Sequence, residues 1–280
     1  MPERLDSYLA AWGLSDPKPL AQTVTSHVYT VSYKGTTAVL KLLTDAGWEE
    51  RTGARALDYY GGHGAVRIFR YDDHAQLLEY VDGEDLIPLV KRGEDERATE
   101  IIANVLNKLH QSQPGVHLPA LTPLRKWFRQ LFARADRDRQ QGVESIFVRA
   151  ATVAGKLLSE SEPPHVLHGD IHHENIRYSA RRGWLAFDPK GLLGERAFDA
   201  ANTLYNPVAM PALIEDEARL LRNAGILSRA LGIDFNRLLS FAFVYGCLSA
   251  VWWLDDGKEP GSELRIAGII ERHIEYPLRH

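Results

Sequence analysis

The sequence predicts an α+β protein of two lobes: a small antiparallel sheet with one main helix, then a larger and mostly helical lobe. Short β-rich runs dominate up to about residue 80, whereas helical periodicity dominates from residue 83 onward. One β hairpin, over 175–187, interrupts the helical part. A chain of 280 residues suffices for both lobes. We therefore expect an amino-terminal lobe over 1–80 and a carboxy-terminal lobe over 81–280.

The strands of the small lobe are predicted from four β-rich runs. Lys34-Gly35 and Asp72-Asp73 separate pairs of these runs, as hairpin turns do. A helix over 48–61, ended by Gly61-Gly62, lies among them, and LDSYLAAWG predicts a short helix near the start. The β-rich runs span 20–33, 36–43, 65–71 and 75–81.

The second lobe is predicted to be helical because apolar residues recur every three to four positions, most clearly over 95–111. The run FAFVYGCLSAVWWL is the most apolar in the chain, but it is shorter than the roughly 20 residues that a membrane span needs. It predicts a buried core helix that contains the lone Cys247. Further helices are predicted over 123–140, 143–160, 214–231, 235–254 and 262–275.

Charge and composition narrow the range of partners. The formal net charge is −4, whereas proteins that bind nucleic acid usually carry a basic excess. The first residues, MPERLDSYLA, contain no apolar signal core. We therefore expect a cytoplasmic protein with neither nucleic acid nor membrane as a partner. The sequence carries no signal for the oligomeric state.

The stretch HGDIHHEN at 168–175 is the densest concentration of chemically active side chains. Asp170 lies on a loop just before a predicted strand, where a carboxylate could accept a proton from a hydroxyl. Asn175 starts that strand, and Asp188 directly follows the returning strand of the hairpin. The hairpin should bring Asn175 beside Asp188, and amide and carboxylate oxygens are suitable ligands for Mg²⁺. This arrangement favours phosphoryl transfer to a hydroxyl.

HGDIHHENI followed by LAFDPKG resembles the catalytic loop and metal-binding segment of the aminoglycoside phosphotransferase family. The AVLK strand and the tail FDAANTLYNP are most similar to its streptomycin 6-phosphotransferase and hydroxyurea phosphotransferase branch. The resemblance runs from about residue 10 to about residue 270. It implies a protein-kinase-like fold and a small-molecule kinase. Such an enzyme uses ATP and Mg²⁺ to phosphorylate a hydroxyl of an aminoglycoside such as streptomycin, or a hydroxyurea-like acceptor.

The resemblance also implies roles for the residues around the loop. Asp170 would be the catalytic base, and Asn175 and Asp188 would hold Mg²⁺. His168 would brace the loop, and Asp199 would be a buried carboxylate that accepts hydrogen bonds from loop amides.

On the nucleotide side, the resemblance places Lys41 of AVLK against the ATP phosphates. The turn TVTSHV would cover these phosphates, with Ser26 and His27 offering backbone donors. Unlike a glycine-rich loop, this region has no glycine between residues 14 and 34. The hinge would comprise Glu79, Tyr80 and Val81, whose backbone would bind adenine.

A second departure concerns the glutamate that orients the lysine in related kinases. Gly53 occupies that position here. Glu50 lies three residues earlier, on the same face of the predicted helix, and we expect it to pair with Lys41 instead. Lys190, in DPKG, is a further candidate for contact with phosphate.

The acceptor should bind on the helical lobe beside Asp170. Trp252, Asp255 and Asp256 are candidates, because carboxylates suit a guanidinium or amine and an aromatic face adds cation–π attraction of about 0.5–2 kcal/mol. The alternative is a core helix with inward tryptophans and a solvated acidic end.

Two other classes of function compete with the kinase. His168, His172 and His173 could hold the metal of a hydrolase, although there is no HExxH motif to support this. A nucleotide-binding protein without catalysis is the other alternative.

Overall fold

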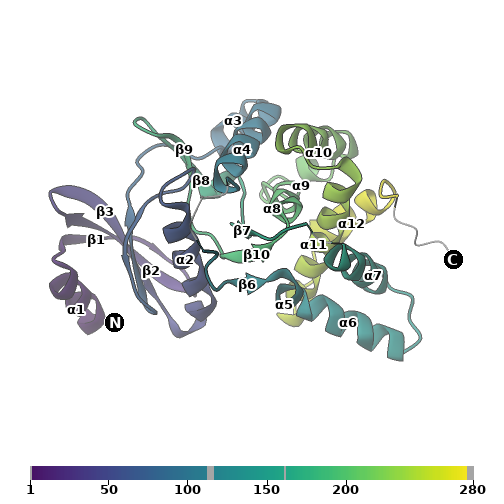
Figure 1. Ribbon diagram of the computed structural model, residues 1–280, viewed down its shortest axis with the longest axis horizontal. Coiled ribbons are helices and arrows are strands. Elements are labelled where there is room, and N and C mark those ends of the chain that lie inside the picture. The colour runs from purple at the N-terminus through teal and green to yellow at the C-terminus, as the bar shows by residue number, and fades with distance from the viewer. Residues whose placement is uncertain (1, 112–116, 161, 276–280) are drawn as a thin grey trace.

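The computed structural model describes residues 2–111, 117–160 and 162–275, which form two lobes side by side (Figure 1). A five-stranded antiparallel sheet with order β1-β2-β3-β5-β4 makes up the small lobe. The helices after β5 make up the large lobe. The strands are β1 (Ser15–Gln22), β2 (Ser26–Tyr33), β3 (Thr36–Leu43), β4 (Ile68–Tyr71) and β5 (Ala75–Glu79).

The two faces of the sheet bury side chains in two separate cores. Leu40 and Leu77 lie in a core that includes Leu9 and Trp12 of α1 (Pro2–Trp12). Leu78, the next residue along β5, lies instead in the main core with residues of α2 (Arg51–Tyr60). This division follows from the two-residue period of a strand.

Two boundaries predicted for the small lobe are wrong. The run 20–33 contains two strands, β1 and β2, which pair with each other across residues 23–25. The predicted helix 48–61 begins as an α-helix only at Arg51, after the 3-10 helix η1 (Asp45–Glu50). Gly47 of η1 lies against the Thr25 carbonyl, so close that a Cβ there would be 2.2 Å from the carbonyl oxygen. The segment therefore bends around the β1–β2 turn before the α-helix starts.

The large lobe contains helices and short strands. The hairpin of β8 (Ile176–Ser179) and β9 (Gly183–Ala186) is confirmed by the antiparallel pairing of these strands. Between β7 (His165–Leu167) and β8 lies the 3-10 helix η2 (His173–Asn175), and β10 (Leu192–Gly194) pairs with both β7 and β6 (Thr122–Pro123). The helices are α3 (Ile87–Lys91), α4 (Asp95–Leu109), α5 (Leu124–Trp127), α6 (Arg129–Gln140), α7 (Ile146–Ser159), α8 (Arg196–Thr203), α9 (Pro211–Ile214), α10 (Glu217–Leu231), α11 (Phe235–Asp255) and α12 (Ser262–Glu271).

Several elements differ from the sequence-based expectation. The predicted helix 123–140 is divided into α5 and α6 at Phe128, whereas the predicted helix 214–231 corresponds to α10, which begins at Glu217. Helix α8 was not predicted, because it has only eight residues and its polar residues Asp199 and Asn202 are buried instead of facing solvent.

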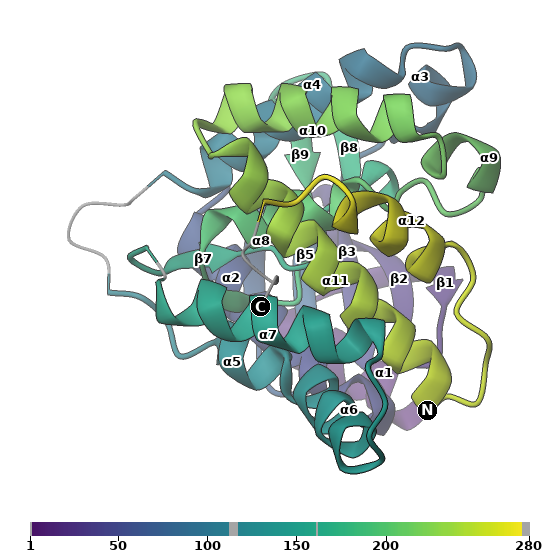
Figure 2. The ribbon, with the colours of Figure 1, turned by 90° about the vertical axis from the view of Figure 1, so that its right-hand side faces the viewer.

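Helix α11 is the long central helix of the large lobe (Figure 2). It contacts α7, α8 and α12 and buries Cys247. Among the described residues, it is the one helix whose length and composition would allow it to cross a membrane, yet 67% of that stretch is buried inside the fold. The prediction of a buried core helix is confirmed.

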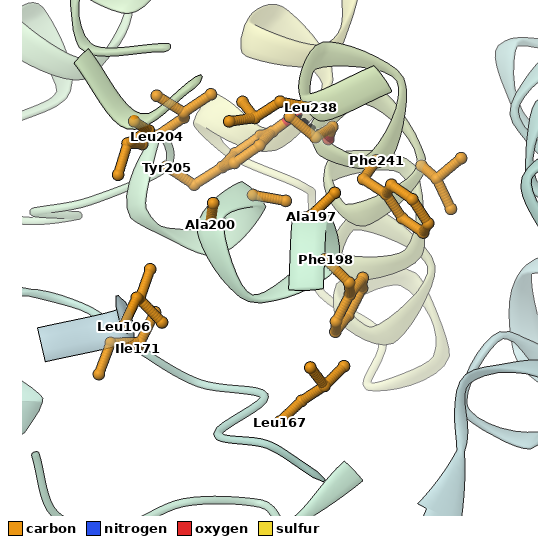
Figure 3. Close-up of a cluster of buried hydrophobic side chains, with 14 of the residues drawn as sticks. Leu106, Leu167, Ile171, Ala197, Phe198, Ala200, Leu204, Tyr205, Leu238 and Phe241 are labelled. Atoms are coloured by element: carbon orange, nitrogen blue, oxygen red, sulfur yellow. Dashed lines mark hydrogen bonds between the residues drawn. The ribbon is translucent and has the colours of Figure 1, made fainter. Parts of the chain in front are cut away.

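The loop after β7 is attached to this core through apolar side chains on both sides of Asp170. Leu167 and Ile171 belong to the same buried cluster as Phe198 of α8 and Phe241 of α11 (Figure 3). Because both neighbouring segments are packed, the position of the Asp170 backbone is set by the core of the large lobe.

A buried ion pair joins α4 to α10. The Arg219 guanidinium donates to both carboxylate oxygens of Asp95 over 2.8 and 2.9 Å, and Asn223 donates to the same carboxylate over 2.8 Å. Burial alone would raise the pKa of Asp95, but the hydrogen bonds and charge of Arg219, together with the hydrogen bond from Asn223, lower this pKa below its ordinary value.

Replacing Arg219→Met should lower the free energy of unfolding by about 3–5 kcal/mol, because the buried Asp95 carboxylate loses its counter-charge. Urea denaturation measures this change. The matched control is Arg222→Met on the same helix: Arg222 pairs with Glu96 over 2.8 Å, but both side chains are about half exposed. The free energy of unfolding of this control variant should fall by less than about 1 kcal/mol. Equal losses in the two variants would contradict this account.

Candidate active site

The loop that carries Asp170 is anchored by a buried carboxylate of α8. Asp199 accepts hydrogen bonds from the backbone amides of His168 and Gly169, over 2.9 and 2.6 Å, and from His110 Nε2 over 2.8 Å. Gly169 has φ +79°, a conformation that side chains rarely tolerate. Asp199 thus lies where the resemblance places a buried carboxylate that accepts hydrogen bonds from the loop amides.

His168 links the loop to the strand that precedes Asp188. Its Nε2 donates to the Phe187 carbonyl over 3.0 Å, while its Nδ1 accepts from the Asp170 amide over 3.3 Å. Burial lowers the pKa of His168, so the ring is neutral and can use one nitrogen as a donor and the other as an acceptor.

The Asp170 carboxylate lies between two polar side chains. Asn202 of α8 donates to its Oδ1 over 3.0 Å, and the Lys190 ammonium lies 3.6 Å from its Oδ2. Asn175 donates its amide nitrogen to the Asp170 backbone carbonyl over 2.9 Å. Because the nitrogen of Asn175 is used in this way, its amide oxygen is the end that can bind a cation.

Asp188 pairs with Lys41 of the small lobe. The Lys41 ammonium on β3 forms a hydrogen bond with the Asp188 carboxylate and lies 2.7 Å from Glu50 Oε2. Burial disfavours both charges. Nevertheless the Asp188 and Glu50 carboxylates raise the pKa of Lys41, and Lys41, followed by Lys190, lowers the pKa of Asp188. Both groups are therefore charged at neutral pH.

The structure gives a steric reason why Glu50 rather than residue 53 lies beside Lys41. The α2 backbone at Gly53 packs against the segment after Asp188, where a Cβ on Gly53 would lie 2.1 Å from the Pro189 carbonyl oxygen. A glutamate at position 53 would need this backbone contact to separate. Glu50, at the end of η1, reaches the lysine without entering the contact.

The β1–β2 turn closes without glycine because a threonine hydroxyl replaces a backbone acceptor. Thr23 Oγ1 accepts from the amides of Ser26 and Thr25, over 3.0 and 3.3 Å. Ser26 and His27 are the first two residues of strand β2. The Ser26 amide, which was expected to face phosphate, is bonded to Thr23 instead. Val24, 82% exposed, forms the tip.

At the expected hinge, Glu79 has a structural partner. Its carboxylate accepts from the Arg67 amide over 2.9 Å and from the Arg182 guanidinium, which also donates to the carbonyls of Gly62 and Ala65. Tyr80 is partly exposed and Val81 is buried.

A pocket of about 340 Å³ contains the three residues expected to bind the acceptor. Gln130 connects two of them, since it accepts from Trp252 Nε1 over 2.8 Å and donates to Asp255 Oδ2 over 3.0 Å. The Trp252 ring packs against the core and also lines the pocket. It therefore combines the two expected alternatives, an acceptor-binding residue and an inward-facing tryptophan of a core helix. The lining residues include Trp127, Gln130, Lys190, Trp252, Asp255 and Asp256.

Two residues of the site were not predicted from the sequence. Asn202 follows Asp199 by three positions, which places both on one face of α8, but the helix itself was not predicted. Gln130 carries no recognisable signal in the sequence.

Two of the three histidines of HGDIHHEN form hydrogen bonds with separate groups, and neither ring nitrogen of the third, His173, has a hydrogen-bond partner in the part of the chain that the structure describes. His168 bonds to Phe187, and His172 Nδ1 accepts from the Glu174 amide over 3.3 Å. His173 is buried, and burial lowers its pKa to about 3. Within the described ranges, no group of three His, Cys, Asp or Glu side chains is arranged to hold a metal ion. The geometry therefore gives the hydrolase alternative no support.

Solved structures share this fold. An aminoglycoside phosphotransferase, solved with AMP-PNP and hygromycin B, aligns with a TM-score of 0.64 over 97% of this chain and 99% of its own, at 15% identity. An ethanolamine kinase of Plasmodium vivax aligns with a TM-score of 0.60 over 95% of this chain and 83% of its own, at 17% identity. These alignments establish a protein-kinase-like fold. Together with the sequence relationships that follow, they define the class of the protein as a small-molecule kinase.

Sequence comparison identifies the family. Streptomycin 3''-kinase of Klebsiella pneumoniae is 35% identical over 88% of this chain and 91% of its own length. Streptomycin 6-kinase of Streptomyces griseus is 29% identical over 80% of this chain and 73% of its own length. Hydroxyurea phosphotransferase of Kitasatospora aureofaciens is 26% identical over 96% of this chain and 78% of its own length. Residues 11–257 match the family model described as aminoglycoside/hydroxyurea antibiotic resistance kinase, and the chain belongs to this family.

Replacing Asn202→Ala should lower kcat for phosphoryl transfer by roughly 10- to 100-fold, because the Asp170 carboxylate loses the donor that orients it. The KM for ATP should change little, and steady-state kinetics separates the two constants. The control is Asn107→Ala, which removes a surface hydrogen bond to the Ala230 carbonyl. A variant at 202 with the parental kcat would show that this hydrogen bond does not position the base.

Proposed function

We propose that the protein transfers the γ-phosphoryl group of ATP, with Mg²⁺, to a hydroxyl of a streptomycin-like aminocyclitol. The position of Asp170 is the observation that carries this proposal. Its carboxylate lies near Lys190, which lines the pocket that holds Asp255 and Asp256, while Lys190 also acts electrostatically on Asp188. Hydroxyurea is the second candidate acceptor, in view of the 26% identical relative.

The residues around Asp188 suit a nucleotide–metal complex. Lys41 would contact the phosphates, with Glu50 holding its ammonium. The Asn175 amide oxygen and the ionised Asp188 carboxylate are hard oxygen donors, which fit Mg²⁺. The bound ion would neutralise phosphate charge.

The remaining nucleotide contacts come from the small lobe and the hinge. We assign adenine to the backbone around Tyr80 and Val81, next to Glu79, whose carboxylate is held by Arg182. The β1–β2 turn, together with Ser26 and His27 at the start of β2, would cover the phosphates. This assignment supports a boundary between the lobes near residue 80, and the need for ATP supports a cytoplasmic location.

On the acceptor side, Asp170 would take the proton of the attacking hydroxyl. Asn202 would hold the carboxylate in the required direction, and His168 and Asp199 would hold the loop. Fixed geometry of this kind is the main contribution that a protein makes to phosphoryl transfer.

Replacing Asp170→Asn should abolish transfer while leaving ATP affinity within about threefold, because the base contacts the acceptor rather than the nucleotide. Release of ADP with streptomycin measures turnover, and a fluorescent ATP analogue measures binding. Asp73→Asn, in an exposed turn of the small lobe, is the control. Parental turnover in the variant would exclude Asp170 as the base. ATP binding by the parent protein without acceptor-dependent ADP release would favour the non-catalytic nucleotide-binding alternative.

Replacing Asp255→Asn and Asp256→Asn together should raise the KM for streptomycin at least about tenfold, because charged hydrogen bonds to its guanidinium groups are lost. The kcat should change much less. Hydroxyurea provides an internal control, since it carries no positive charge and its kinetics should be unaffected. An unchanged KM for streptomycin would place the cationic part of the acceptor elsewhere. The phosphorylated position, 3'' or 6, follows from phosphorus–proton couplings of the product.

A further inference from the structure

Lys190 lies between the residues proposed to bind the nucleotide–metal complex and those proposed to bind the acceptor. Its ammonium lies 3.6 Å from the Asp170 carboxylate, and the residue lines the 340 Å³ pocket. It also acts electrostatically on Asp188, as one cause of the lowered pKa of that carboxyl. A single cation therefore lies near the proposed base, a proposed metal ligand and the pocket at once.

The backbone of Lys190 is held from both lobes. Its amide donates to the His168 carbonyl over 2.7 Å, and its carbonyl accepts from Thr52 Oγ1 of α2 over 2.6 Å. Gly191 has φ +69° and packs against the Thr52 backbone, where a Cβ would lie 2.3 Å from the Thr52 carbonyl oxygen. The point of attachment of the side chain is therefore fixed, while the side chain itself is one-third exposed. A lysine held in this way can move its ammonium over a few ångströms without moving the backbone.

The pairing between Lys190 and Asp170 is a loose one. The ammonium lies 3.6 Å from the carboxylate, beyond the length of a normal hydrogen bond, and the lysine side chain is one-third exposed. The ammonium can therefore leave this carboxylate for another anion at little cost in free energy. The transferring phosphoryl group, which spreads negative charge over its oxygens, offers a stronger partner at the required place.

We propose that Lys190 is a catalytic residue that leaves Asp170 for the transferring phosphoryl group when nucleotide and acceptor are both bound. The inference rests on the proposed function and adds to it a cation on the acceptor side, opposite Lys41. In this step the acceptor oxygen forms a bond to the γ-phosphorus while the bond from that phosphorus to the β,γ-bridging oxygen breaks. ADP leaves with the electron pair of the broken bond, the hydroxyl proton passes to Asp170, and Lys190 remains charged throughout.

Steady-state kinetics of Lys190→Ala, Lys190→Gln and Lys190→Arg is the first test. The Ala and Gln variants should lose roughly 100-fold in kcat, the loss expected when one donor to a charged transition state is removed. The KM values for ATP and acceptor should stay within about threefold. The Arg variant should retain part of the activity, because it keeps the charge. Lys91→Ala, at the exposed end of α3, should behave as the parent.

The second test uses ADP, Mg²⁺ and aluminium fluoride, which together imitate the transferring phosphoryl group. In the parent protein, aluminium fluoride should tighten ADP binding, as measured by calorimetry with acceptor present. Lys190→Gln should lose most of that gain while binding ADP alone normally. A merely structural pairing with Asp170 would not change this difference. Melting temperatures of all variants identify any that fail to fold, and the remaining substitutions then decide the test.

Either a parental kcat in Lys190→Gln, or a raised acceptor KM with normal kcat, would overturn the inference. The second result would make Lys190 an acceptor-binding residue. The failure of the proposed function is a separate outcome, in which the parent protein itself transfers no phosphate to any acceptor tested.

Discussion

The ammonium of Lys41 is the interaction on which the geometry of the site depends. It lies on a strand of the small lobe and is shared by Glu50, at the end of η1, and Asp188, at the end of the β8–β9 hairpin. Two neighbouring segments of the small lobe and the distant end of the β8–β9 hairpin are thereby held around one charge. The Lys41 side chain is only 9% exposed, so the loss of its carboxylate partners would leave its ammonium with little water to solvate it, whereas the Asp188 side chain is 42% exposed.

A second anchor holds the loop that carries Asp170. Asp199 accepts hydrogen bonds from backbone amides of this loop, and Leu167 and Ile171 on either side of Asp170 pack in the same apolar cluster as α8. The loop is thus tied to the rigid core of the large lobe, whereas Lys41 belongs to the small lobe. Lys190 links the two lobes: its backbone is bonded to His168 of the large lobe and to Thr52 of the small lobe.

The sequence allowed much of this arrangement to be predicted where signals are local. A hairpin between Asn175 and Asp188 follows from alternating strands around a turn, and helical spacing was enough to nominate Glu50. Features that depend on tertiary packing were not accessible. Helix α8 is only eight residues long, and its polar residues Asp199 and Asn202 face the buried loop rather than solvent, so the role of Asn202 was missed. The strands β6, β7 and β10 are only two or three residues long, too short for a recognisable pattern. The Gln130 bridge joins residues more than 120 positions apart.

The close approach of α2 to the segment 189–191 makes distant positions interdependent. Gly53 and Gly191 let two backbones touch, and this contact excludes any larger residue at either position. A side chain at 53 would force α2 away from the Pro189 carbonyl and would also shift the backbone of Lys190, which is bonded to Thr52 of α2. The two glycines are therefore coupled positions: a larger residue at either one disturbs the surroundings of both Lys41 and Lys190, although neither glycine has a side chain in the site.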